Sequence, residues 1–195
     1  MDPTIDMVGV GNAIVDVITT VSESFIADHG LAKGSMTLIG AERADQLYAA
    51  MPAGIESSGG SAANTAVGVA SFGGSAAYIG KVRDDQLGEV FAHDMRASGV
   101  AYDVQPASSG APTARCLIQV TPDAERTMNT YLGISALLEP ADSNRVNLIA
   151  LRASTMKAAR ENRISNLLEL RPGLVFQHIR DRSLVAIGCL VKFDF

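Results

Sequence analysis

Two adjacent glycines, Gly59 and Gly60, open the part of the sequence best suited to chemistry, and a polar residue, Asn64, follows them. Glycine has no Cβ, so the backbone at this pair can approach a ligand closely. The small residues from Ser61 to Phe72 predict a helix directly after the pair, and its free N–H groups and positive dipole end lie at the same place. This combination favours a polar, hydroxyl-rich or anionic small molecule as ligand.

A second polar pair, Asn12 and Asp16, lies near the start of the chain. The apolar residues Ile5 to Val10 predict a buried strand that ends just before Asn12, and open α/β sheets bind ligands beyond the carboxyl ends of their strands. A carboxylate accepts hydrogen bonds from two neighbouring hydroxyls, and an amide both donates and accepts. The alternative is that Asp16 faces water from an edge strand, but the Gly59-Gly60 pair and Asn64 favour the binding interpretation.

Strands and helices alternate along the first two thirds of the chain, which favours a mainly parallel, doubly wound α/β sheet. Strands are predicted at 13–21, 35–39, 76–79, 114–121 and 126–131, and helices at 41–51 and from Asp84 or Asp85 to about Ala97. The four residues 122–125 predict a hairpin turn between the last two strands. These hairpin strands are too numerous for the parallel core, so we expect a small β-sheet that projects from it.

Composition limits the classes of function. The chain has 195 residues, 47% of them apolar and 19% charged, which is typical of a folded domain. Its net charge of −5 argues against nonspecific nucleic-acid binding. No apolar run is long enough to span a membrane, and the amino terminus is a poor secretory signal, so we expect a cytoplasmic protein with no membrane partner. The two cysteines, Cys116 and Cys189, are expected to be reduced and buried.

Charge and glycine content change near residue 140. Residues 1–140 hold 7 Lys and Arg against 16 Asp and Glu, whereas residues 141–195 hold 9 against 5. Sixteen of the 18 glycines lie before residue 140. The tail predicts a basic helix to about Leu170 and apolar strands at 174–179 and 183–192. We therefore expect one part at 1–142 and a tail of different character at 143–195.

Four segments of the chain form a recognisable set: GNAIVDV, GGSAANTA, GGSAAYIGKVRDDQLG and PTARCLIQVTPDAERTMNTYLG. Together they resemble the PfkB, or ribokinase-like, carbohydrate and nucleoside kinases, in particular their adenosine-kinase and sugar-kinase branch. The resemblance covers about residues 5–142. It implies a ribokinase-like three-layer α/β sandwich with a small β-sheet lid, and transfer of the γ-phosphoryl group of ATP, with Mg²⁺, to a sugar hydroxymethyl group.

The resemblance also implies roles for individual residues. Asn12 and Asp16 would hold the sugar hydroxyls, and the same pocket would be lined by Gly59, Gly60 and Asn64. In the segment Ala124-Glu125-Arg126-Thr127, the resemblance places Arg126 near the phosphates, with a solvated lid arginine as the equal alternative. Asn129 is a weaker candidate for the same role.

One family motif, a Gly-Ala-Gly-Asp loop that supplies the catalytic aspartate, does not occur in the sequence, where only Gly173 and Gly188 follow residue 140. Phosphoryl transfer depends on positioning and electrostatics, so loss of this loop is severe. The sequence therefore predicts no catalytic residue. It predicts a chain that is truncated before the ATP-binding half but keeps the sugar-binding face. The alternatives are a noncatalytic binding module that forms a homodimer through its lid strands, and a nonfunctional fragment.

Overall fold

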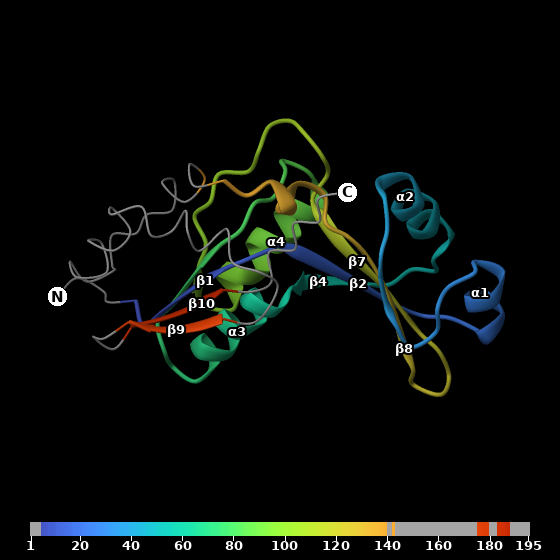
Figure 1. Ribbon diagram of the computed structural model, residues 1–195, viewed down its shortest axis with the longest axis horizontal. Helices are drawn as coiled ribbons and strands as arrows, with labels where there is room; N and C mark the ends of the chain where they lie inside the picture. The colour runs from blue at the N-terminus through green and yellow to red at the C-terminus, as the bar shows by residue number, and fades with distance from the viewer. Residues whose placement is uncertain (1–4, 140–141, 143–174, 180–182, 188–195) are drawn as a thin grey trace.

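Two five-stranded β-sheets form the framework of the protein (Figure 1). The computed structural model describes residues 5–139, 142, 175–179 and 183–187. The predicted tail helix lies outside the described residues. Mixed α/β architecture is thus confirmed, with the helices packed against sheets of parallel and mixed pairing.

The first sheet, called here the body sheet, has the strand order β6-β5-β1-β10-β9. Its strands are β1 (Met7–Val10), β5 (Ala76–Ile79), β6 (Val100–Ala101), β9 (Val175–Ile179) and β10 (Ser183–Ile187). β1 pairs in parallel with both β5 and β10, while β9 runs antiparallel to β10. Two strands predicted in the tail are therefore present: β10 lies against β1, and β9 lies against β10.

Helices α3 (Ser61–Ser71) and α4 (Gln86–Ala97) contribute to the core around the body sheet. Small side chains of α3, among them Ala62 and Ala66, allow close packing. The rings of Tyr78, Phe91 and Tyr102 form a tilted and edge-to-face cluster with centroids 5.4–6.1 Å apart. The bounds of α4 agree with those that its periodic apolar residues predict, and of the two expected caps, Asp84 or Asp85, the structure has Asp85 at the N-cap.

The second sheet, called the lid sheet, has the order β3-β8-β7-β2-β4. Its strands are β2 (Ile14–Thr20), β3 (Met36–Leu38), β4 (Ile55–Gly59), β7 (Ala114–Val120) and β8 (Arg126–Tyr131). β7 and β8 form the predicted antiparallel hairpin, and β2 runs parallel to β7. β2 lies inside the sheet between β4 and β7, so Asp16 does not lie on an edge strand.

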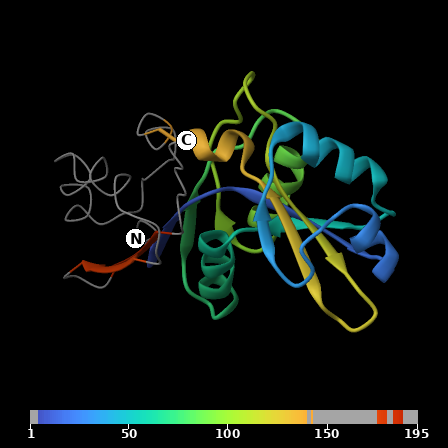
Figure 2. The same ribbon diagram turned by 45° about the vertical axis from the view of Figure 1, so that its right-hand side comes forward.

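Among the described residues, two helices pack against one face of the lid sheet. Val17 and Leu117 on this packed face contact Leu47 of α2 (Ala41–Ala50), with Phe25 of α1 (Glu23–Asp28) partly buried beside them. Both helices lie at the end of the molecule away from β9 and β10 (Figures 1 and 2). Because side chains alternate along a strand, the neighbours of Val17 and Leu117, including Asp16 and Cys116, lie on the opposite face, called here the open face.

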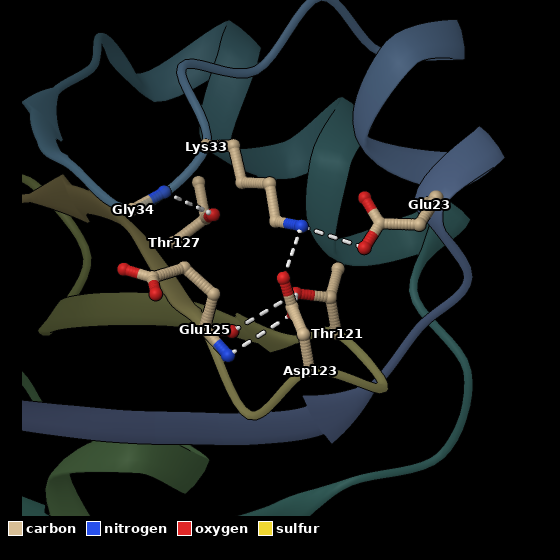
Figure 3. Close-up of polar contacts among 7 residues, drawn as sticks. All are labelled: Glu23, Lys33, Gly34, Thr121, Asp123, Glu125 and Thr127. Atoms are coloured by element: carbon tan, nitrogen blue, oxygen red, sulfur yellow. Dashed lines mark hydrogen bonds and ion pairs between the residues drawn. The ribbon is translucent and has the colours of Figure 1, made fainter.

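Polar contacts fasten the tip of the lid hairpin (Figure 3). Lys33 Nζ contacts a carboxylate of Glu23 at 2.6 Å and one of Asp123 at 2.7 Å. The Gly34 N–H donates to Thr127 Oγ1 at 3.0 Å. These contacts join the hairpin turn to the segment between α1 and β3, so the elements at this end of the lid are held together.

Replacing Lys33 with methionine should lower the midpoint of thermal unfolding slightly at neutral pH, because exposed ion pairs contribute little. Hydrogen bonds from Lys33 and Thr121 hold the pKa of Asp123 below its ordinary 3.8. A lowered carboxyl pKa stabilises the fold above pH 3.8, and this contribution is lost as the pH falls further. The difference between wild type and Lys33→Met should therefore shrink below pH 3.8. Lys33→Arg is the matched control, and a difference independent of pH would contradict the assignment.

Candidate functional site

Asp16 occupies the open face of the lid sheet, near the point where the lid joins the body. It pairs with Ser57 on β4 and with Cys116 on β7, and it is half-buried. Burial raises the pKa of Asp16, while the positive charge of Arg126 partly lowers it. The carboxylate is thus partly desolvated, which strengthens any hydrogen bond that it accepts.

The two glycines lie directly against the polar residues from the start of the chain. A Cβ built on Gly59 would fall on the Asp16 carboxylate, 2.6 Å from Oδ1. A Cβ on Gly60 would lie 2.8 Å from the backbone oxygen of Asn12, and Gly60 has φ +92°, a conformation that favours glycine. Side chains at these two positions would displace the groups proposed to bind a ligand.

Asn12 and Asn64 complete this group. Asn12 is buried in the link between β1 and β2 and lies beside Gly60. Asn64 is in the first turn of α3, where its N–H donates to the Gly60 oxygen at 2.9 Å, and it is exposed. Gly60 is the N-cap of α3 and supplies no capping side chain, so the start of this helix faces the same region.

The structure therefore brings Asn12, Asp16, Gly59 and Gly60 together, with Asn64 one helical turn away. Arg126 is exposed and shares the open face, since it pairs with Val120, which in turn lies beside Thr20 of β2. The effect of its charge on the Asp16 pKa places it within electrostatic reach of the site.

Asn129 is not part of this group. It pairs with Leu117 on the packed face, is 4% exposed, and donates from Nδ2 to Gln119 Oε1 at 3.0 Å. Strand alternation turns it away from Asp16, so its predicted contact with phosphate has no geometric support here.

Cys116 is the residue of this site that the sequence interpretation left out. Its buried thiol lies beside Asp16 on the neighbouring strand and accepts a hydrogen bond from Thr130 Oγ1 at 3.2 Å. Burial raises its pKa to about 11, so the thiol is protonated at neutral pH and forms an apolar wall. Only the register of β2 on β7 reveals this position, because the two residues are 100 positions apart.

The described part of the chain has neither a metal-binding cluster nor a helix that could cross a membrane. No three His, Cys, Asp or Glu residues in it are grouped so that they could hold a metal ion. In those same residues, no helix has the length and apolar character needed to cross a bilayer.

The two-sheet α/β framework matches the fold of solved adenosine and sugar kinase structures. The model of the pfkB family carbohydrate kinases matches residues 31–167. The chain belongs to this family.

Solved structures and curated relatives agree with this assignment. The adenosine kinase from Sinorhizobium meliloti is 55% identical, with a TM-score of 0.66 over 71% of this chain and 42% of that one. A probable sugar kinase from Rhizobium etli is 51% identical, with a TM-score of 0.66 over 73% of this chain and 43% of that one. Fructokinase-1 from Zea mays is 38% identical over 50% of this chain and 31% of its own length. The chain spans about a third of this curated relative and covers part of the family fold.

Proposed function

We propose that this chain binds the hydroxyl-bearing ring of a sugar or nucleoside between Asp16, Asn12 and the Gly59-Gly60 pair. One observation carries the proposal: the Asp16 carboxylate lies in the space that a side chain at Gly59 would fill. A ligand whose hydroxyls donate to Asp16 would therefore lie next to the Gly59 backbone. The role of Asn64 is to contribute a further amide from the start of α3.

The names of similar proteins support two substrate classes. Structures near 50% identity include an adenosine kinase and a probable sugar kinase, and the curated relatives include fructokinases. All three names are compatible with a ligand that carries neighbouring hydroxyls and a hydroxymethyl group. The proposed ligand is therefore of this chemical class, with adenosine and fructose as the first probes.

Family membership implies ATP as phosphoryl donor, and the resemblance adds Mg²⁺. The described residues contain no group of three or more His, Cys, Asp or Glu side chains that could hold a metal ion. Arg126 is the residue proposed to approach phosphate, since its charge reaches the Asp16 environment. Because the sequence contains no Gly-Ala-Gly-Asp motif, we expect negligible phosphoryl transfer by this chain alone.

Ligand-induced stabilisation tests the binding proposal. A ligand that binds only the folded state raises its stability by RT ln(1 + [L]/Kd). Fructose, ribose, adenosine and inosine should be compared at several concentrations, and at least one should raise the unfolding midpoint in a concentration-dependent way. A parallel assay with radiolabelled ATP should show no transfer. If none of the four ligands raised the unfolding midpoint, the binding proposal would be wrong. Phosphoryl transfer from ATP at ordinary rates would contradict the expected inactivity.

Exposed apolar side chains favour a second candidate, a module that forms a homodimer through the lid. Met36 is 57% exposed and Ile55 71% exposed, and both pair with residues of the open face, Met128 and Ile18. Sedimentation with and without ligand distinguishes this module from a monomer, and ligand-independent aggregation would indicate a nonfunctional fragment.

Two further expectations remain proposals. A division near residue 142 is supported by the change in charge and glycine content, although the family match runs across it to residue 167. A cytoplasmic location is supported by the buried free thiol of Cys116.

A further inference from the structure

Helix α4 holds the last part of β4 through an aspartate. Asp94 Oδ2 accepts a hydrogen bond from the Ser58 N–H at 2.8 Å, and the Asp94 side chain is 30% exposed. Its other oxygen lies 3.3 Å from the exposed His93 ring. Ser58 directly precedes Gly59, so this bond fixes the backbone next to the glycine pair.

The same helix holds the approach to β7 through a second aspartate. Asp85 Oδ2 accepts from the Thr113 N–H at 3.0 Å, and Oδ1 accepts from Thr113 Oγ1 at 2.7 Å. Oδ1 also accepts from the Gly88 N–H at 2.9 Å and so caps α4. Thr113 is fully buried and directly precedes Ala114, the first residue of β7.

These two bonds lie on either side of β2, the strand that carries Asp16. Gly59 of β4 and Ala114 of β7 both pair with Ile14, so the three residues form one row across the base of the lid. Such a row spans about 10 Å. Asp85 and Asp94 are about 13 Å apart along the helix axis. One helix can therefore hold both outer strands of the row.

We propose that Asp85 and Asp94 are positioning residues that set the spacing between Asp16 and Gly59, and so control ligand affinity without contacting the ligand. The contact between Gly59 and the Asp16 carboxylate leaves no space, so a small shift of the outer strands changes the site. Hydrogen bonds to a carboxylate are stronger than neutral ones, which suits them to this task. The inference rests on the proposed function, since affinity is its main readout.

The test compares Asp94→Ala with Asp94→Asn, which removes the charge but keeps an acceptor for the Ser58 N–H. Glu89→Ala is the control, because Glu89 is an exposed carboxylate on the same helix. The first readout is the Kd for fructose and adenosine by titration calorimetry. Asp94→Ala should raise Kd about tenfold, Asp94→Asn should restore most of the affinity, and Glu89→Ala should have no effect. Thr113→Val tests the Asp85 side in the same way, with Thr113→Ser as its conservative partner.

The second readout needs no ligand and separates this inference from the proposed function. The Asp16 carboxyl is titrated by carbon NMR in each variant. Loss of positioning lets water reach Asp16, so its raised pKa should fall toward 3.8 in Asp94→Ala and less so in Asp94→Asn. If the Asp16 pKa in Asp94→Ala is the same as in wild type, the inference is overturned. If wild type binds no ligand but the Asp16 pKa changes as expected in Asp94→Ala, the proposed function is overturned and the positioning of Asp16 is supported.

Discussion

Asp16→Asn is expected to weaken sugar or nucleoside binding about 30-fold while leaving the fold at least as stable as wild type. Hydrogen bonds to a charged group contribute about 1.5–3 kcal/mol, and the loss of one such bond gives this change in Kd. Asparagine keeps the size of the side chain but has only one acceptor oxygen. Titration calorimetry with the best ligand of the panel measures the change.

The stability half of this prediction follows from the pKa of Asp16, which burial raises above its ordinary 3.8. The folded state then binds the proton more tightly than the unfolded state, so the charged carboxylate lowers the free energy of unfolding as the pH rises above 3.8. Asp16→Asn removes this effect, and its advantage should grow from pH 3.8 toward neutral pH. Asp103→Asn, an exposed position, is the matched control. Equal binding by wild type and Asp16→Asn would remove Asp16 from the site.

Local signals in the sequence predicted much of the fold. The strand Ala76–Ile79 has the bounds expected from its apolar run, and α4 is capped by Asp85, one of the two adjacent aspartates expected there. The hairpin of β7 and β8 follows from alternating residues around a polar turn. Each of these signals is carried by residues close together in the chain, so a single sequence contains enough information.

Three of the elements that were not predicted have a clear physical reason. β4 has the polar sequence Ile-Glu-Ser-Ser-Gly, which lacks the period of a half-buried strand and is stabilised by pairing with β2. Helix α1 is six residues long, and the 3₁₀ turn Gly133–Leu137 is five, so both are too short for a clear helical period.

The site shows the same division between local and distant information. Residue types at a strand end suggested Asn12 and Asp16 as binding residues, and the family resemblance placed them in one pocket with the glycine pair, which is far from them in the sequence. The face of Asn129 was not predictable, since its adjacent residues, Met128 and Thr130, are one apolar and one polar and give no clear alternation. The strand register decided it, through the pairing of Asn129 with Leu117.

Gly59→Ala is expected to abolish most ligand binding with a smaller effect on folding. Gly59 does not have a positive φ, so alanine fits the backbone, but its Cβ would meet the Asp16 carboxylate. Asp16 must then move from the site. We expect Kd to rise at least a hundredfold, which corresponds to about 2.7 kcal/mol.

Gly60→Ala should instead act mainly on folding. Its φ of +92° strains any other residue, and its Cβ would lie 2.8 Å from the Asn12 backbone oxygen. Such strain costs about 1–3 kcal/mol and should lower the unfolding midpoint by several degrees.

Gly68→Ala, in the helix α3 that follows the glycine pair, provides the control for both variants. A Cβ at Gly68 has nothing within 4 Å, and alanine in a helix interior is more favourable than glycine by about 1 kcal/mol. This variant should raise the unfolding midpoint and leave Kd unchanged, so α3 itself tolerates substitution. If Gly59→Ala bound fructose or adenosine as tightly as Gly68→Ala does, the space beside Asp16 would have no part in ligand recognition. Unequal effects in the expected order would instead locate the ligand at the Asp16 side of the glycine pair.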